Sequence, residues 1–489
     1  MTILISGLAP GLVTASERNS AGHAPFADVS RPRANADEAA ACKAWFVQAD
    51  SALRRANIHD AASVPLPDAP WLHSSRWLNG LFGLTHHDPA LREAWLTLAA
   101  DTGFTSWQAR LARLAPDHHW APTLWHCQQA LLDQQLTAGN DIGALTLPEI
   151  PDSYNTWQRA LGLYPLTRRL AAPAVNRYHR TMSARLASND VQAARFFLAP
   201  HAPQGDGAMT APEHVANLPP LALPDDATRN VLLQHYAPVI ATERDKHDNH
   251  PGAIAIDDAG IRVLTNDPVS YTWLTWTRFN NTPLLQLNYQ FWFPRRPATG
   301  RFDMYAGELD SVIWRVTLRP DGKVLFYDSI HACGCYHKLF ISTASADRIA
   351  HRVPDGDRPV TAPAPVPDAA TQRLQLLLES GTHYLVGVTA ATPIHHTDTV
   401  PDMLPATRYR LHAADKLRQL PAPDGGITSL FNSNGLIPAS RRPERFTLWP
   451  MGIPSAGAMR QQGTQATAFI GRRHFDDGDL AETLFTSLE

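Results

Sequence analysis

The residues with the most reactive side chains lie close together in the stretch SIHACGCYH, residues 329–337. Imidazoles and thiolates are ligands for zinc, and they also serve as base and nucleophile in many hydrolases. If this stretch continues a β-strand, side chains at alternate positions leave the backbone on one side. The sequence therefore predicts one strand face that carries His331, Cys333, Cys335 and His337.

A straight strand cannot bring all four groups to one ion. At about 3.3 Å per residue, His331 and His337 would stand roughly 20 Å apart, whereas bonds to zinc are about 2.0 to 2.3 Å long. Gly334 permits a bend that gathers both cysteines and one histidine. We therefore expect one divalent metal, zinc rather than calcium, with a further ligand among His247, His250 and His383.

The two cysteines also have interpretations without a metal. They can form a short disulfide or lie as small buried thiols. Alternatively, Cys335 or Cys333 is the nucleophile of a hydrolase. In that case His383 is the base and Asp398 orients it. A free thiol is only a few per cent ionised at neutral pH, so a neighbouring histidine would be essential.

A metal-dependent hydrolase is a further alternative. In the stretch RDKHDNHPG, His247, Asp248 and His250 would bind an ion shared with a histidine of residues 329–337. An open coordination position would then hold the attacking water.

A binding protein without turnover is the main hypothesis. Polar side chains on and beside the predicted strands would recognise a small molecule, a lipid headgroup or a glycan. The residues expected to bind this ligand are Glu308, Asp310, Gln286 and Asn288, with His331 and His383 at the same edge.

The strands that must position these groups have a clear pattern. In LLQLNYQFWF, residues 284–293, apolar and polar side chains alternate, which predicts a strand with one core face and one polar face. A second strand, ELDSVIWRVTL, ends at the turn RPDGK, where proline and glycine favour a reversal. The sequence thus predicts a hairpin that leads into residues 329–337.

The N-terminal half carries helical signals instead. Residues 36–55 place apolar side chains on one stripe, and Asp88-Pro89 is typical of a helix start, with Gly103 expected to end that helix. Cys42 and Cys127 are expected to be thiols in the helical core. We predict an α+β protein with an N-terminal helical domain followed by a mainly antiparallel β-sandwich. The predicted boundaries are 1–36 (flexible or targeting), 37–198 (helical), 199–226 (linker) and 227–489 (β-rich).

Composition limits the partners. The net charge is −3 and charged residues make up 18%, which argues against a general nucleic-acid binder. No apolar run is long enough for a transmembrane helix. Residues 159–185 hold six arginines and no acidic residue. This segment is either a solvated helix face or a peripheral contact with an anionic membrane. The apolar segment Ile3–Val13 leaves export to the periplasm or the exterior open beside a cytoplasmic location.

The order of elements in the C-terminal half resembles the β-sandwich of necrosis-inducing, cytolysin-like toxins and their vacuolar-sorting relatives. Residues 1–226 are unmatched. The matching pieces are Tyr236-Ala237-Pro238, Tyr289–Phe293, Trp314–Leu318, Ser329-Ile330-His331 and Gly381-Thr382-His383.

This resemblance implies a divalent cation at a lipid-recognising surface, held by acidic residues that flank the tryptophan. The present chain departs from the pattern, because Ile313 and Arg315 occupy those positions. An arginine cannot ligate a cation. The resemblance therefore implies the fold more than the cation site, for which only Glu308 and Asp310 could substitute.

Overall fold

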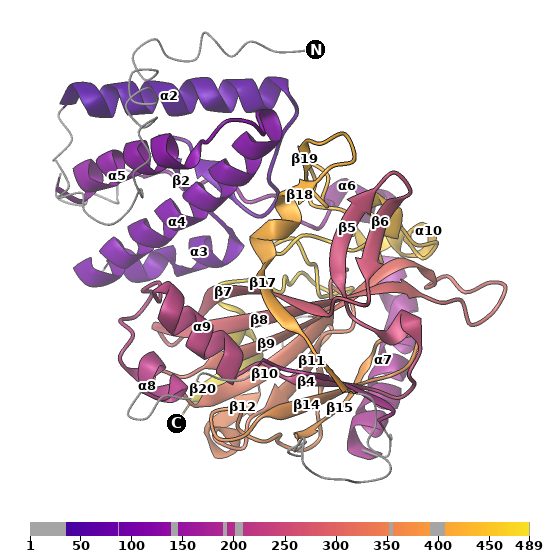
Figure 1. The fold of residues 1–489 in the computed structure, drawn as a ribbon. Coiled ribbons are helices and arrows are strands. Elements are labelled where there is room, and N and C mark those ends of the chain that lie inside the picture. Colours follow the sequence, from indigo (N-terminus) through magenta and orange to yellow (C-terminus); the bar gives the residue numbers. More distant parts are fainter. Residues whose placement is uncertain are drawn as a thin grey trace.

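The computed structural model describes residues 36–86, 88–137, 145–188, 193–200, 209–351, 356–391 and 406–488. Helices dominate the N-terminal half and strands in sheets dominate the C-terminal half (Figure 1). The predicted α+β class is confirmed at this level. The apolar segment Ile3–Val13 lies outside the described residues.

The first helices form a group at one end of the molecule, at the upper left of Figure 1. They are α2 (Ala36–Arg55), α3 (Arg76–Leu81), α4 (Pro89–Leu114) and α5 (Ala121–Thr137). Cys42 in α2 and Cys127 in α5 form a disulfide. The prediction that both are thiols was wrong, because the two helices pack side by side and their cysteines face each other.

Helix α4 runs through Gly103, where the sequence pattern predicted its end. A Cβ at this position would lie 2.4 Å from the carbonyl oxygen of Trp71. Glycine is therefore needed for close packing against β2 (Ala69–Ser74), which pairs with β1 (Val64–Leu66), rather than for helix termination. The start at Asp88 is as predicted, because its side chain accepts a hydrogen bond from the backbone N–H of Ala90.

The largest sheet has seven strands in the order β13-β11-β10-β9-β8-β7-β17. Its centre is antiparallel, and the predicted hairpin is present, with Gly322 in a left-handed conformation at its turn. The strands are β7 (Val269–Phe279), β8 (Thr282–Arg296), β9 (Gly307–Leu318), β10 (Val324–His331), β11 (Lys338–Ile341), β13 (Val360–Thr361) and β17 (Arg410–Ala413).

A second sheet of five strands has the order β15-β14-β4-β3-β16. One apolar cluster contains residues of both sheets, including Leu376 of β14 and Tyr289 of β8, and it extends to the helices α2–α5. The strands are β3 (Arg195–Leu198), β4 (Val239–Thr242), β14 (Leu374–Leu378), β15 (Leu385–Ala390) and β16 (Ala406–Arg408).

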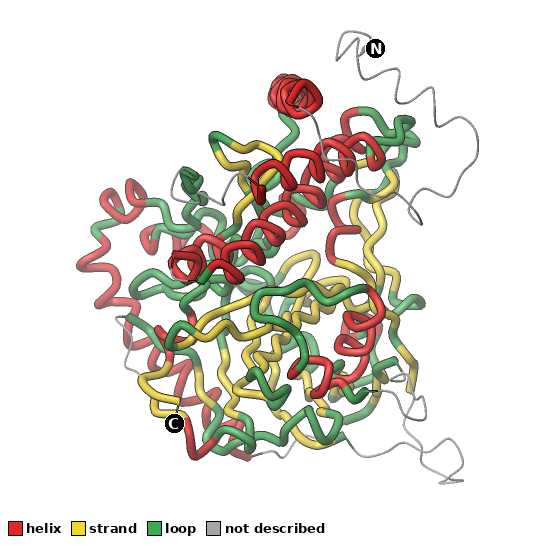
Figure 2. The backbone as a smooth tube through the Cα atoms, turned by 90° about the vertical axis from the view of Figure 1, so that its left-hand side faces the viewer, coloured by secondary structure: helices red, strands yellow, loops and turns green. Residues whose placement is uncertain are grey.

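The remaining elements cover the edges and ends of these sheets, with helices along the outside (Figure 2). Strand β3 lies within the residues assigned to the helical domain, and α8 lies within the expected linker. The helices are α6 (Thr156–Leu161), α7 (Tyr164–Ser188), α8 (Ala211–Ala216), α9 (Asp226–His235), α10 (Arg445–Leu448) and α11 (Leu480–Leu484). The short strand pairs are β5 (Ala253–Asp257) with β6 (Gly260–Leu264), β12 (Ile349–His351) with β20 (Phe485–Leu488), and β18 (Leu420–Pro421) with β19 (Ile427–Thr428).

None of the helices in the described ranges combines the length and the apolar character needed to cross a bilayer.

Candidate functional site

The Cys-Gly-Cys stretch is a tight turn, not a strand. Strand β10 ends at His331, the backbone N–H of Gly334 donates to the carbonyl of His331 at 2.7 Å, and Gly334 is left-handed. A Cβ at Gly334 would lie 2.1 Å from the carbonyl oxygen of Ala466, so only glycine fits. The prediction of a single strand face for all four reactive residues was therefore wrong, because the reversal separates His331 from His337.

The carboxylate of Asp310 is the centre of a buried cluster. The Nδ1 atoms of His331 and His383 lie 3.2 and 2.9 Å from its two different oxygens. The guanidinium of Arg442 donates to it at 3.1 Å, and so does the backbone N–H of Ser311 at 3.0 Å. The structure thus brings together Asp310, His331 and His383, three residues proposed from separate stretches of the sequence.

The two histidines of this cluster differ in their second nitrogen. The Nε2 atom of His383 lies 2.9 Å from the carbonyl oxygen of Asp248, so both of its ring nitrogens lie within hydrogen-bond distance of an oxygen atom. The Nε2 atom of His331 has no partner. Burial lowers the pKa of His331 to about 4, so this imidazole is neutral at pH 7. Although burial opposes it, the charge of Arg442 and the hydrogen bonds from His331 and His383 hold the pKa of Asp310 well below its usual value.

A cage of tyrosines covers the cluster. Tyr336 and Tyr384 contact the ring of His331, and the guanidinium of Arg296 lies 5.9 and 5.1 Å from their ring centroids. Lys338 lies 5.3 Å from the Tyr384 ring, and burial lowers its pKa to about 7. These contacts seal the histidine from solvent.

Three non-glycine residues beside the cluster adopt left-handed backbone conformations. They are Leu309, Tyr336 and His383, with φ of 57°, 64° and 54°. Such residues cost of order 1–3 kcal/mol each and persist only where surrounding contacts enforce them. The packing of the cluster therefore holds the backbone in a strained arrangement.

The two cysteines of the turn are free, buried thiols. The backbone N–H of Cys335 points at the sulfur of Cys333 at 3.4 Å. The contact with Cys333, together with burial, raises the pKa of Cys335 well above its usual value. A protonated thiol is a poor nucleophile. Asp398 lies outside the described residues, so the thiol hydrolase stays a prediction.

The metal ligands expected from the sequence lie apart. His250 pairs with Asp245 at 2.6 Å and His247 is exposed, whereas His331 and His337 contact different aspartates. Within the described ranges, no group of three or more His, Cys, Asp or Glu residues is placed to hold a metal ion. The guanidinium on Asp310 also opposes a cation there. The divalent metal therefore stays a prediction, and we derive no step through it.

The polar face of β8 forms a buried layer rather than a ligand surface. The side chain of Gln286 bonds to Thr275 and Thr317, and that of Asn288 bonds to Thr275. On the same face, Asp328 accepts hydrogen bonds from Arg315 and from His337, and the ring of Phe475 lies 3.5 Å from the Arg315 guanidinium.

Of the four residues expected to bind the ligand, Gln286, Asn288 and Asp310 are buried, whereas Glu308 is exposed on the edge of β9. These four side chains therefore do not form one surface.

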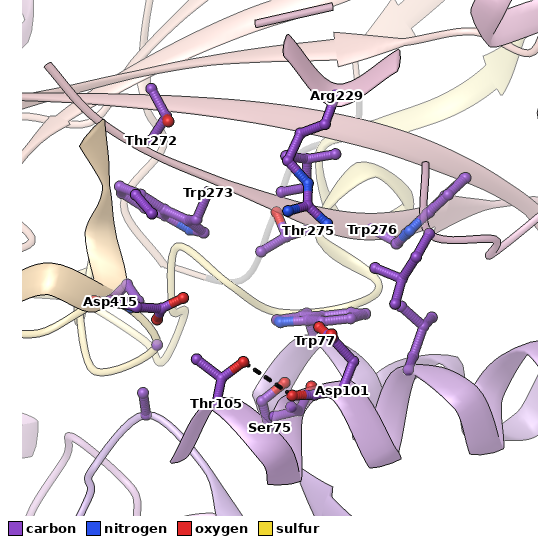
Figure 3. Close-up of a pocket in the computed structure, with 18 of the residues that line it drawn as sticks. Ser75, Trp77, Asp101, Thr105, Arg229, Thr272, Trp273, Thr275, Trp276 and Asp415 are labelled. Carbon is purple, nitrogen blue, oxygen red and sulfur yellow. Dashed lines mark hydrogen bonds between the residues drawn. The ribbon is translucent and has the colours of Figure 1, made fainter. Parts of the chain in front are cut away.

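A cleft of about 460 Å³ lies between the N-terminal helices, α9 and β7 (Figure 3). Its walls come from segments far apart in the chain, so sequence spacing could not reveal it. The polar and aromatic residues of interest are Ser75, Trp77, Asp101, Thr105, Arg229, Trp273, Trp276, Asp415, Arg418 and Asp476.

The charged groups of the cleft face one another. Figure 3 shows Arg229 reaching from α9 toward Trp77 and Asp101, with Asp415 at the left side of the view. Although Asp101 is open to the cleft, the surrounding walls exclude enough water to raise its pKa to about 6, and Asp415 adds to this effect while Arg229 opposes it. Asp415 pairs with Arg418, which also binds Asp60.

Three polar atoms that line the cleft lack a hydrogen-bond partner in the protein. They are Trp273 Nε1, Arg418 Nε and Asp476 Oδ1, the last of which forms an ion pair with Arg315 at 3.6 Å. The last two belong to side chains that are nearly completely buried. Buried polar groups are normally satisfied by protein, water or ligand. A sequence signal for this site is the pair of closely spaced tryptophans in YTWLTWTRF, residues 271–279.

Comparison with family models, curated proteins and solved structures finds no match for the chain.

Proposed function

We propose that the protein binds a polar, ring-shaped ligand, such as a sugar unit of a glycan, in the cleft between α4, α9 and β7. The observation that carries this proposal is the lining, in which three tryptophans lie together with four aspartates and two arginines. Sugar rings present apolar C–H faces and hydroxyl edges. Indole rings pack on the C–H faces, while carboxylates and guanidinium groups form hydrogen bonds with the hydroxyls.

The size and electrostatics of the cleft support the same class of ligand. A volume of about 460 Å³ lies at the lower part of the range of about 300 to 1,000 Å³ that small-ligand sites occupy. Both signs of charge are present, so a neutral polyhydroxy ligand fits better than a strongly charged one. Trp273 Nε1, which has no hydrogen-bond partner, would donate to a hydroxyl oxygen. Asp476 Oδ1, which is ion-paired with Arg315 but accepts no hydrogen bond, would accept from a hydroxyl.

In this proposal the Asp310 cluster has a structural role, because Asp310, His331 and His383 are buried and cannot touch a ligand in this conformation. It would fix β9 and β10, and through them the centre of the large sheet, whose strand β7 forms one wall of the cleft.

A second candidate function is hydrolysis of a glycosidic bond in the same cleft. The specific observation is that Asp101 and Asp415 have different environments: desolvation raises the pKa of Asp101 to about 6, whereas Asp415 is paired with Arg418. Two carboxyl groups, one protonated and one ionised, are what glycoside hydrolysis requires. Asp101 would be the acid and Asp415 the base or nucleophile.

Three further proposals concern the whole chain. The two sheets would pack as a β-sandwich like that of the necrosis-inducing toxin family, which the shared apolar cluster supports. Export to an oxidising compartment is supported by the Cys42–Cys127 disulfide. A divalent metal stays the cofactor proposal, with His331 Nε2 as the one ligand atom of the cluster that has no partner.

The test of the cleft is a thermal-shift and calorimetry panel with soluble cello-, xylo-, malto- and chito-oligosaccharides. A ligand at 100 times its dissociation constant stabilises the folded state by about 2.7 kcal/mol. We expect at least one sugar to raise Tm in the wild type and to lose this effect in Trp273→Ala and Asp101→Asn.

Trp125→Ala and Asp117→Asn are the matched controls, because both residues lie outside the cleft. They should keep the effect. A panel without any shift, or equal shifts in all variants, would contradict the proposal. Reducing ends released by the wild type but not by Asp101→Asn would establish the hydrolase.

A further inference from the structure

A set of exposed apolar side chains comes from neighbouring elements that lie outside the α2–α5 group, whose ribbons Figure 1 shows. They come from α6, the start of α7, and α10 with the following turn. We call this set the basic apolar surface: Trp157, Leu161, Leu163, Leu166, Leu170, Phe446 and Trp449, with Arg168 and Arg169. Leu161 and Leu170 are 69% and 72% exposed, which is unusual for leucine.

The elements of this surface are tied to one another. The side chain of Arg159 in α6 donates to the carbonyl of Met451 at 2.8 Å, and the backbone N–H of Asn155 donates to the carbonyl of Gly452 at 2.6 Å. At Gly162, between α6 and α7, a Cβ would lie 2.6 Å from Pro450. The apolar side chains therefore form one fixed patch rather than separate mobile tips.

The start of α7 exposes apolar side chains that no other part of the described protein covers. Leu166 and Leu170 are four residues apart on one face of α7, and Leu163 directly precedes the helix; all three side chains are exposed. Met182 lies on another face and is buried in the protein. An exposed leucine stripe of this kind is more than the scattered apolar residues of an ordinary surface and marks a contact site.

The positive charges of this surface favour an anionic partner. Residues 156–188 contain no Asp or Glu. Four exposed arginines of α7 form no ion pair with any carboxylate in the described part of the chain: Arg168, Arg169, Arg177 and Arg180. Apolar residues flanked by unpaired arginines match the acyl region and the anionic headgroups of a lipid surface. A protein partner would have to supply both an apolar groove and several carboxylates.

We propose that the basic apolar surface docks the protein on an anionic lipid bilayer, with α7 lying in the headgroup region. The leucines and Trp157 enter the interface, and the arginines contact lipid phosphates. The helix lies on the membrane and does not cross it. This proposal does not depend on the ligand of the cleft.

The experiment is co-sedimentation of the full chain with vesicles of phosphatidylcholine alone and of phosphatidylcholine with phosphatidylglycerol. We expect binding to the anionic vesicles only, weakening as NaCl is raised. Arg168→Glu/Arg169→Glu should lower the partition constant about tenfold or more, because each basic residue near an anionic surface contributes on the order of one kcal/mol. Leu166→Ser/Leu170→Ser should lower it as well.

The matched controls are Arg54→Glu/Arg55→Glu and Val47→Ser on α2, where the same residue types are exposed away from the surface. Controls that bind like the wild type support the proposal. Absence of binding to anionic vesicles, or equal loss in the controls, overturns it. A dimer in sedimentation equilibrium that dissociates in Leu166→Ser/Leu170→Ser, without vesicle binding, also overturns it and identifies an interface between copies.

Discussion

His331 and His383 bind opposite oxygens of one carboxylate, that of Asp310, at 3.2 and 2.9 Å. They come from the end of β10 and from the turn before β15, so this single side chain joins the two sheets.

Asp310→Asn should destabilise the protein by about 3–5 kcal/mol, because it leaves the buried Arg442 guanidinium without a counter-charge. Urea unfolding followed by circular dichroism measures this loss. Glu308→Gln, two residues away and exposed, should change stability by no more than about 0.5 kcal/mol. Equal effects of the two substitutions would show that the cluster contributes little.

The free energy of unfolding should already decrease between pH 6.5 and pH 4, above the range in which surface carboxylates take up protons. His331 and His337 have pKa values lowered by burial from 6.5 to about 4. The unfolded chain takes up these protons near pH 6.5 and the folded chain only near pH 4, so stability is complete above pH 6.5 and falls as pH decreases to 4. The slope is up to about 1.4 kcal/mol per pH unit for each histidine.

The measurement is the free energy of unfolding at several pH values between 7.5 and 4.5. His337→Gln keeps a donor for Asp328 but does not titrate, so its slope should be shallower by nearly one proton. His119→Gln, an exposed histidine, should keep the wild-type slope. Identical slopes in all three proteins would contradict the assignment.

Reduction should lower the melting temperature, because the Cys42–Cys127 disulfide links positions 85 residues apart. A loss of about 2–5 kcal/mol is typical for a native disulfide. The variant Cys42→Ser/Cys127→Ser should melt at one temperature with and without reductant, whereas Cys333→Ser/Cys335→Ser should keep the wild-type sensitivity. In denaturant without reductant, thiol titration should find two groups; finding four would contradict the disulfide.

Gly103→Ala should destabilise the protein, although alanine in a helix interior is normally about 0.5–1 kcal/mol better than glycine. The new Cβ would lie 2.4 Å from a backbone carbonyl that cannot move freely, and overpacking of this kind costs about 1–3 kcal/mol. Gly83→Ala has nothing within 4 Å of its Cβ and serves as the control. A gain in Tm for Gly103→Ala would mean that α4 and β2 are further apart than described.

The period of β8 could be predicted because alternation is a local property: Leu285 and Leu287 do face the core, and Gln286 and Asn288 face the other way. The burial of the polar face of β8 could not be predicted. This face is buried because residues near the C-terminus, including Phe475, fold across it, and no local pattern predicts which distant segment covers a face.

The reactive residues show the same limit. The sequence shows which residues of 329–337 are reactive but not how the backbone arranges them. At Gly334 the expected strand is replaced by a turn, which hydrogen bonds and a close contact with Ala466 stabilise. The cleft could not be predicted from the sequence for a related reason. Asp101, Arg229 and Asp415 lie on three separate segments that line the same cleft only in the folded protein.

The covering of the polar layer also has a consequence for biosynthesis. Arg315 is neutralised and shielded by Asp328 and by residues 475–476, and Phe475 lies 160 residues further along the chain than Arg315. Until those residues leave the exit tunnel, the nascent sheet carries a row of amides and one guanidinium without their cover. The polar layer of the large sheet is therefore covered only after this distant segment has been synthesised and has folded across it.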